Sequence, residues 1–535
     1  MKYIFVSGGV ISGLGKGVAT ASIAKILKAA GFRVAPLKID PYLNVDAGTM
    51  NPVEHGEVFV TDDGAETDQD IGNYERFLNE SLNKTNYATS GLIYLTVIQK
   101  ERALEYDGAC VEAIPHIPQE IIRRVTEAGK ANKADVVIIE IGGTVGEMQN
   151  TFYFEANRLM KLRKPHDVIH VHLSYLPIPA SIGEMKSKPA QMSVRELNSM
   201  GIQPDILLAR STTPVDATRR KKLSLFCNLE PEDVISAPDV SSIYKVAINF
   251  EDGGLTDRIL KKLKLKRKQK DMSEWRAFYD KIEKSEKVVK IGIVGKYFTS
   301  GDFTLSDAYL SVIEAIKHAS FTQNLKPEID WLDAGKILEK PEVLKKYDGI
   351  IVPGGFGGRD IEGKVATAKY CRENKIPYLG LCYGMQMMAI EFARNILGYK
   401  DANSTEINPK SKAPVIHIMS EQEKKILKKD YGGTMRLGAW DCELKPGSLT
   451  RKLYGKSRIS ERHRHRYEVN NKYRKEFEKN GLNIVGTSPD EKLVEIMEIP
   501  NHPFMIGSQF HPELKSRPLS PHPLFMGFIE ASANK

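Results

Sequence analysis

Cysteine is scarce in this sequence, and the few cysteines are not paired by spacing. The 535 residues contain five, which are Cys110, Cys227, Cys371, Cys382 and Cys442, and no CxxC motif occurs. An odd, scattered set argues against a disulfide framework and against a cysteine-based zinc site, and it indicates a reducing compartment. We therefore expect a cytoplasmic protein.

Long apolar runs are also missing. No uninterrupted stretch approaches the ~18 residues of a membrane span. The apolar first eleven residues are interrupted by glycines, and no A-x-A-like cleavage site follows them. The formal net charge is only +9, and part of that excess lies in residues 261–270. These features argue against a membrane protein and against a nucleic-acid surface, whereas small polyanions such as nucleotides would suit the mild basic bias.

Strand-like and helix-like segments alternate along most of the chain. In residues 1–265 the β-rich runs are KYIFVS, RVAPLKI, ADVVIIEIGG, HDVIHVHLS and PDILLARS, and ISAPDV precedes a helix expected near 241–250. Residues 266–287 are polar, carry no strand signal and are predicted to be a partly helical interdomain linker. A second alternation over 288–535 begins with VKIGIVG, a helix at about 305–318 and IDWLD, and it continues with GIIV and IPYLGL. The pattern predicts an α/β protein with two doubly wound domains, since strand–helix alternation gives parallel sheets covered by helices.

A glycine-rich turn with a lysine follows the first strand, in GGVISGLGKG. Backbone N–H groups of such a turn can face an anion at a helix N-terminus, and Lys16 would add a mobile charge for phosphates. The pattern G-x-x-x-x-G-K-[ST] is not met, because Val10 and Gly17 replace its first glycine and its hydroxyl residue. A nucleotide site is one interpretation, and a tight turn with a solvent-exposed lysine is the other.

If the turn supplies no magnesium ligand, carboxylates elsewhere must do so. Asp70 ends the acidic segment TDDGAETDQD, and Glu140 ends the apolar run VVIIE, where a parallel sheet binds its ligands. For Glu140 the alternative is a solvated acid at a strand end. Asp62, Asp63 and Asp68 are better explained as ordinary loop acids.

A candidate nucleophile lies in the second half. Cys382 stands between a strand and a helix in G-x-C-x-G, the cysteine version of a nucleophile elbow, although a structural cysteine would also fit. Downstream, SQFHPE places His511 and Glu513 at the spacing of a base and the acid that orients it. The loop PGGFGG offers N–H groups for an oxyanion hole.

Taken together, these elements resemble class I glutamine amidotransferases in the second half and the CTP synthase family over almost the whole chain. The stretches that carry the resemblance are GGVISGLGKG, KIDPYLNVDAGTMNPVEHGEVFVTDDGAETDQDIGNYERF, EIGGTVGE, KSKPAQ, GIQPDILL, VPGGFGGRD, LGLCYGMQ, ANSTE, GGTMRLG, ERHRHRYEVNN and QFHPE. The resemblance implies a P-loop-NTPase-like amidoligase domain over 1–265, which binds UTP and ATP, a linker over 266–287, and a flavodoxin-like glutamine amidotransferase domain over 288–535.

The resemblance also implies the activity. Such ligases phosphorylate the 4-oxygen of UTP with magnesium ATP, and ammonia released from glutamine is channelled internally to give CTP, the last step of de novo pyrimidine nucleotide synthesis. It implies GTP as allosteric activator, with Arg359 as a candidate contact, CTP as feedback inhibitor and a homotetramer. It leaves filament formation open.

Carried over by position, the resemblance implies four sets of site residues. The catalytic set is Cys382 as nucleophile with His511 and Glu513. The ATP set is Gly13, Leu14, Gly15, Lys16, Gly17, Val18, Lys38, Asp70 and Val240, with Asp70 and Glu140 as magnesium ligands. The UTP and CTP set is Ser12, Glu147, Met148, Gln149, Lys186, Ser187, Lys188, Pro189, Ala190, Gln191 and Lys222. The glutamine set is Gly355, Leu381, Cys382, Tyr383, Gly384, Met385, Glu406 and Arg466, with Arg466 as the carboxylate clamp.

The chain departs from the family pattern at three places. Glu147-Met148-Gln149 stands where Asp-Ile-Glu is usual, KSKPAQ has serine and alanine in place of threonines, and Tyr383 replaces a leucine beside the nucleophile. These departures bear on CTP feedback and affinity rather than on the reaction.

Two other functions remain open from the sequence. One is a related amidotransferase that amidates a carboxylate, against which KSKPAQ and EIGGTVGE argue. The other is a nucleotide-sensing scaffold with an inactive glutaminase half, against which the intact Cys382, His511 and Glu513 argue.

Overall fold

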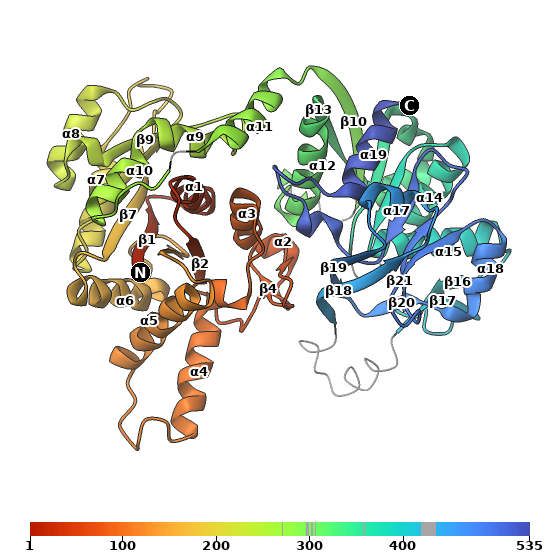
Figure 1. Ribbon diagram of the computed structural model, residues 1–535, viewed down its shortest axis with the longest axis horizontal. Helices are drawn as coiled ribbons and strands as arrows, with labels where there is room; N and C mark the ends of the chain where they lie inside the picture. The colour runs from red at the N-terminus through yellow and green to blue at the C-terminus, as the bar shows by residue number, and fades with distance from the viewer. Residues whose placement is uncertain are drawn as a thin grey trace. The chain divides into compact units, whose positions relative to one another are not determined.

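The computed structural model describes residues 1–535 except 270, 296–298, 301–302, 305, 356, 359 and 419–434, and gives only the backbone at 52–53, 299–300, 303–304 and 306–307. The chain forms two compact units (Figure 1). Unit 1 comprises Met1–Ala47 and Asp70–Tyr279, and unit 2 comprises Gly48–Gln69 and Asp280–Lys535. The predicted functional boundaries at 265 and 288 stay a prediction.

Unit 1 is built on a seven-stranded parallel sheet in the order β5-β2-β6-β1-β7-β8-β9. Its strands are β1 (Lys2–Gly9), β2 (Val34–Asp40), β5 (Tyr87–Thr89), β6 (Val136–Ile141), β7 (Val168–Tyr175), β8 (Ile206–Ser211) and β9 (Val234–Pro238). The five β-rich runs of the first half form β1, β2, β6, β7 and β8. Every residue of β6 is buried, because helices cover both faces of the sheet.

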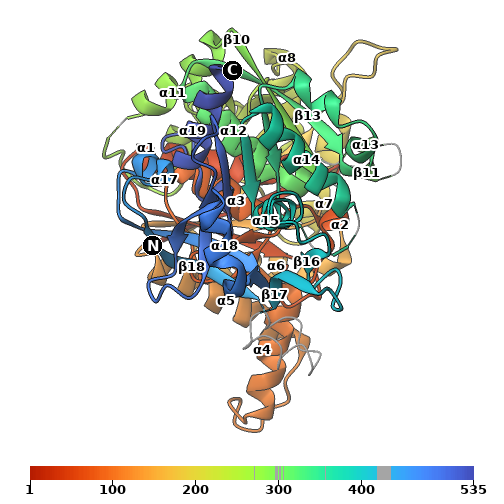
Figure 2. The ribbon, with the colours of Figure 1, turned by 90° about the vertical axis from the view of Figure 1, so that its right-hand side faces the viewer.

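The helices of unit 1 lie on both faces of this sheet. They are α1 (Lys16–Ala29), α3 (Gln69–Leu78), α4 (Ser90–Arg102), α5 (Ala113–Ala131), α6 (Thr151–Arg163), α7 (Lys188–Ser199), α8 (Ala217–Cys227), α9 (Lys245–Asp252), α10 (Leu255–Lys262) and α11 (Ser273–Lys284), with short 3-10 turns η1 (Lys84–Asn86), η2 (Met148–Asn150) and η3 (Pro231–Asp233). Figure 1 shows α1 and α9 on one side and α5 and α6 on the other, whereas α4 projects beyond the sheet (Figure 2). No described helix is long and apolar enough to cross a bilayer.

The predicted linker begins as part of unit 1. Within it, α11 buries Trp275 completely, and the indole packs against Phe77 and Tyr244 with ring centroids 5.0 and 5.6 Å away. The expected helix near 241–250 is present as α9.

Unit 2 has a nine-stranded mixed sheet in the order β13-β10-β14-β15-β23-β22-β21-β18-β19. These strands are β13 (Leu325–Asp333), β10 (Lys287–Gly295), β14 (Gly349–Val352), β15 (Tyr378–Leu381), β23 (Met505–Ser508), β22 (Val494–Glu498), β21 (Asn483–Thr487), β18 (Arg436–Leu444) and β19 (Arg458–His465). The first five pair in parallel, as the strand–helix alternation predicts. The last four extend the sheet in antiparallel fashion, which the sequence pattern did not predict.

Smaller elements complete unit 2. The short strands are β3 (Phe59–Val60), β4 (Glu66–Thr67), β11 (Thr299–Ser300), β12 (Phe303–Thr304), β16 (Ala402–Ser404), β17 (Ala413–Ile418) and β20 (Tyr467–Val469). The helices are α2 (Pro52–His55), α12 (Leu310–Thr322), α13 (Ala334–Glu339), α14 (Ile361–Asn374), α15 (Tyr383–Asn395), α17 (Leu449–Tyr454), α18 (Arg474–Lys479) and α19 (Pro523–Ala533), with η4 (Ser306–Tyr309), η5 (Pro341–Lys346), η7 (Asn471–Tyr473) and η8 (Pro512–Lys515). The helix expected at about 305–318 is thus divided into η4 and α12.

Residues 48–69 lie between β2 and α3 in the chain but pack within unit 2, and we call them the 48–69 segment. Arg462 Nε donates to Asp62 Oδ1 at 2.6 Å, and Arg464 Nε donates to Glu66 Oε1 at 2.8 Å. At the start of α12 the Ser311 N–H donates to Glu57 Oε2 at 3.0 Å. These carboxylates attach the segment to β19 and α12.

Candidate active sites

Cys382 lies in a sharp turn between β15 and α15. Its backbone has φ 49° and ψ −96°, a strained conformation for a residue with a side chain. A Cβ on Gly380 would lie 2.7 Å from the backbone carbon of Gly384, and a Cβ on Gly384 would overlap the carbonyl oxygen of Val352. Both glycines are therefore required by close backbone approach, which is the geometry expected of a nucleophile elbow.

His511 and Glu513 follow β23, the strand paired with β15. The imidazole Nδ1 donates to Glu513 Oε1 at 2.7 Å, which leaves Nε2 for chemistry. Burial alone would lower the pKa of His511, but the Glu513 carboxylate and the Cys382 sulfur raise it well above its usual range. A Cβ on Gly354 would lie 2.8 Å from the ring, so the glycine loop packs directly against the imidazole.

These three side chains line one cavity inside unit 2. Gly355 and Arg466 line it as well, and its other walls are Gly48, Met50, Glu57, Val58, Ala308, Tyr309, Gly354, Met435, Arg464 and Leu514. Burial and the neighbouring Arg464 lower the pKa of Arg466, while Glu406 opposes the shift. A guanidinium remains charged under these conditions, so the cavity combines a nucleophile, a base and a cation.

The remaining residues predicted to bind glutamine lie outside the cavity lining. Leu381, Tyr383, Gly384 and Met385 are buried in the turn behind Cys382. The Tyr383 hydroxyl donates to the Gly357 carbonyl at 2.8 Å, and the Gly357 N–H donates to Glu406 Oε1 at 2.8 Å. In this arrangement Tyr383 and Glu406 hold the glycine loop.

In unit 1 the glycine-rich turn joins β1 to α1. Gly13 and Gly15 have φ of 67° and 89°, and α1 begins at Lys16. The stem of Lys16 lies back along Gly8, where an added Cβ would be 2.9 Å from Lys16 Cδ. Burial lowers the pKa of Lys16, and the nearby Glu140 opposes that shift. Lys16 is thus directed along the turn rather than into solvent.

A cluster of charges surrounds this lysine. Lys38 Nζ donates to Asp70 and, at 3.0 Å, to Glu140 Oε1, and it lies 3.6 Å from Asp40. The Tyr74 hydroxyl donates to the other oxygen of Glu140. Burial raises the pKa of Glu140, while Lys38 opposes the shift. With 1% of its surface exposed, Glu140 is not a solvated acid at a strand end.

Asp70 and Glu140 suit a hard divalent cation. Both carboxylates pair with the same Lys38 ammonium, and carboxylate oxygens are the donors that Mg²⁺ prefers alongside phosphates. A Cβ on Gly17 would overlap Asp70 Oδ1, so the carboxylate occupies the place of a hydroxyl residue after the lysine. The residues present therefore fit magnesium without a Ser or Thr at position 17.

A mostly apolar pocket lies beside the glycine-rich turn. Leu14, Gly15, Val18 and Val240, all predicted to bind ATP, line it together with Leu173, Arg210, Asp239, Ile243 and Phe250 among others. Arg210 donates to the Leu14 carbonyl and, at 3.1 Å, to Asp239 Oδ1. Such a pocket suits a planar base next to a phosphate-binding turn.

Two of the residues predicted to bind UTP line a second surface pocket. Ser12 and Glu147 line it with Thr144 and Glu196, and the Thr144 N–H donates to Glu147 Oε1 at 2.9 Å. Pro189 lines an adjacent pocket. The structure does not bring the rest of the set to these pockets. Three of these side chains contact neighbours along the chain: Gln149 donates to Glu147, Lys186 pairs with Glu184, and Gln191 donates to Ser187. Met148 is 91% exposed, Lys188 begins α7, Ala190 is buried on α7, and Lys222 lies on α8.

Comparison with known proteins gives a family match for each part of the chain. The family model for the CTP synthase N-terminus matches residues 2–265, and that for class-I glutamine amidotransferase matches residues 304–531. The CTP synthase of Caldanaerobacter subterraneus subsp. tengcongensis is 49% identical over 536 residues, covering 100% of this chain and 98% of its relative. The CTP synthase of Bacillus subtilis is 47% identical over 534 residues, and the match covers 99% of this chain and 98% of that relative. The chain belongs to the CTP synthase family.

A solved structure of the glutaminase domain of the Trypanosoma brucei relative, titled as bound to acivicin, is 37% identical to this chain. The match covers 46% of this chain and 94% of the solved chain, with a TM-score of 0.43.

Sequence reasoning missed several residues of these sites. Arg464 and the 48–69 segment line the cavity of Cys382, and both lie inside stretches that resemble the CTP synthase family, although their roles were not assigned. Tyr74 lies in one of these stretches as well, whereas Arg210 lies outside them; both contact phosphate-site residues and neither had a predicted role. Arg359 lies outside the described residues.

Proposed function

We propose that this chain converts UTP to CTP with ATP and glutamine, through a UTP phosphorylated at its 4-oxygen and ammonia that passes inside the protein. The proposal is supported by two clusters of reactive groups on one chain of the CTP synthase family. A nucleophile, base and cation share one cavity in unit 2, and lysines meet carboxylates beside a phosphate-binding turn in unit 1.

The glutaminase step uses the groups of unit 2. The Cys382 thiol gives its proton to His511, and the thiolate attacks the amide carbon of glutamine while Arg466 binds the substrate carboxylate. The imidazolium returns the proton to the amide nitrogen, the C–N bond breaks and ammonia leaves a glutamyl thioester. Water, deprotonated by His511, then cleaves the thioester to glutamate. Backbone N–H groups of the loop at Gly354 and Gly355 support the oxyanion.

The synthetase step uses the groups of unit 1. The 4-oxygen of UTP attacks the terminal phosphorus of ATP, and ADP leaves. Ammonia then attacks C4, and inorganic phosphate leaves with the oxygen. Lys16 and Lys38 balance charge on the transferring phosphoryl group. Asp70 and Glu140 would hold magnesium, which would supply further charge neutralisation.

An internal route for ammonia follows from its chemistry, because ammonia in bulk water at neutral pH is mostly ammonium, which is not a nucleophile. We further propose GTP activation of glutamine hydrolysis, CTP feedback and a homotetramer, on the strength of family membership.

The test is a paired assay with the full-length protein, UTP and Mg·ATP, comparing glutamine, with and without GTP, against ammonium as nitrogen source. CTP should form from both. Turnover with a carboxylate acceptor but no product with UTP would overturn the proposal in favour of a carboxylate-amidating enzyme.

A further inference from the structure

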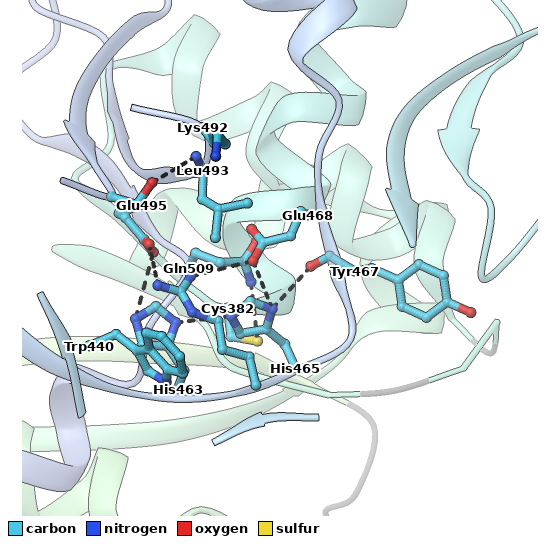
Figure 3. A network of polar contacts seen from close by, with 12 residues as sticks. Cys382, Trp440, His463, His465, Tyr467, Glu468, Lys492, Leu493, Glu495 and Gln509 are labelled. Atoms are coloured by element: carbon cyan, nitrogen blue, oxygen red, sulfur yellow. Dashed lines mark hydrogen bonds and ion pairs between the residues drawn. The ribbon is translucent and has the colours of Figure 1, made fainter. Parts of the chain in front are cut away.

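A chain of buried amides and imidazoles lies next to Cys382 (Figure 3). Gln509 is completely buried, and its Nε2 donates to Cys382 Sγ at 3.6 Å. It stands two residues before His511, yet the glutaminase mechanism above does not use it. Gln386, on the first turns of α15, is 2% exposed and contacts Gln509.

The hydrogen bonds fix which atom of Gln509 faces the sulfur. The Tyr467 carbonyl can only accept, so the Gln386 atom 3.0 Å away is Nε2. The same Nε2 lies 3.3 Å from an atom of the Gln509 amide, which must therefore be the acceptor Oε1. Gln509 Nε2, a donor, is then the atom aimed at Sγ.

The Tyr467 carbonyl is itself held in place by a buried cluster. It also accepts from His465 Nδ1 at 3.2 Å, and His465 Nε2 lies 2.9 Å from His463 Nδ1. Arg436 joins the cluster to Glu468 at 3.4 Å and to Glu495 at 2.7 Å. Burial and the Arg436 guanidinium lower the pKa of both histidines well below the usual range, which suits a neutral pair joined by one directed hydrogen bond.

We propose that Gln509 is a further catalytic residue of the glutaminase site, whose amide donates a hydrogen bond to the Cys382 thiolate. Gln386 is the positioning residue that orients this amide. The proposal deepens the function proposed above. A neutral donor at this place stabilises the charge on sulfur before acylation and again when the thioester breaks, and it leaves Arg466 and His511 to the substrate.

The test is the alkylation rate of Cys382 by iodoacetamide in the full-length protein, followed by mass spectrometry of its peptide, with exposed Cys110 as internal reference. Gln509→Leu should slow the alkylation of Cys382 about 10- to 100-fold, which is the effect of losing a hydrogen bond to a charged group. The alkylation rate of Cys110 should stay unchanged. Gln323→Leu, a part-buried glutamine elsewhere in unit 2, should change neither rate. Alkylation needs no turnover of UTP, so a failure of the proposed function and a failure of this proposal are distinguishable.

Wild-type alkylation of Cys382 in Gln509→Leu would overturn the proposal. If circular dichroism and thermal unfolding show that Gln509→Leu has lost its fold, the near-isosteric Gln386→Glu decides. Its carboxylate cannot donate to Tyr467 or to Gln509, so the Gln509 amide loses its orientation and Cys382 should again be alkylated more slowly. An unchanged rate in Gln386→Glu would overturn the proposal.

Discussion

The Asp70 carboxylate occupies the space that a side chain at position 17 would fill. A Cβ added to Gly17 would overlap Asp70 Oδ1, while Asp70 also accepts from Lys38. The glycine that breaks the usual lysine–hydroxyl pattern is thus complementary to a carboxylate from α3.

Gly17→Ala should therefore lower CTP synthesis from ammonium, by about a hundredfold, because the side chain displaces Asp70 from Lys38. Glutamine hydrolysis in the absence of nucleotides should be unaffected. In an Asp70→Ala background the same substitution should cost little more, since the group it displaces is already absent. If the activity losses of Gly17→Ala and Asp70→Ala multiply in the double variant, Gly17→Ala does not act by displacing Asp70.

Cys382→Ala should abolish glutamine-dependent synthesis, by at least about a thousandfold, and preserve ammonium-dependent synthesis. The nucleophile is lost, whereas the groups around Lys16 are untouched. Steady-state CTP formation with each nitrogen source measures this, with exposed Cys110→Ala as the matched control. Full activity with glutamine would remove Cys382 from the mechanism.

Glu513→Gln should shift the pH profile of glutamine hydrolysis. After the opposing effect of burial, the Glu513 carboxylate is the first cause that raises the pKa of His511, so the imidazolium persists above the ordinary histidine range. If the imidazolium–thiolate pair is the reactive form, activity falls on the basic side as His511 deprotonates. Removing the carboxylate should move this basic limb to lower pH and reduce kcat/KM about tenfold or more. A limb that stays in place would show that another group titrates.

Glu66→Ala should loosen the 48–69 segment. Its carboxylate is 5% exposed and pairs with Arg464, and breaking a buried pair from one side costs about 3–5 kcal/mol. Backbone amides of residues 48–69 should exchange hydrogen faster, and the KM for glutamine should rise because Gly48, Met50 and Val58 line the cavity. Asp490→Ala, which breaks an exposed pair with Lys492, is the control and should alter neither property.

Much of the fold follows from local pattern. The β-rich runs of the first half form strands, and Cys382 lies in the turn that its flanking glycines predict, because these signals depend on a few adjacent residues. The same reasoning predicts Glu140 near the carboxyl end of a buried strand, and the structure places it there, one residue before the end of β6, whereas its role as a magnesium ligand stays a prediction. The strands β18, β19, β21 and β22 are not predicted, because antiparallel strands that follow one another without a crossover helix leave no strand–helix alternation.

The parts of the sites that could not be predicted depend on distant pairings. Arg462 and Asp62 are 400 positions apart in the chain, and nothing in the sequence around either residue indicates that the two form an ion pair. The donor role of Gln509 emerges only when Gln386, Tyr467 and Cys382 are placed together, since a lone glutamine has no spacing signature.

The path of the 48–69 segment sets a limit on how this chain can be divided. A glutaminase half cut out at residue 265 would lack four lining residues of its own cavity, and it would lack the Asp62 and Glu66 carboxylates that pair with Arg462 and Arg464. Chimeras between relatives would accordingly have to exchange residues 48–69 together with the C-terminal half. The unit of recombination is therefore a discontinuous stretch of sequence, and the border between the two halves does not coincide with any single position in the gene.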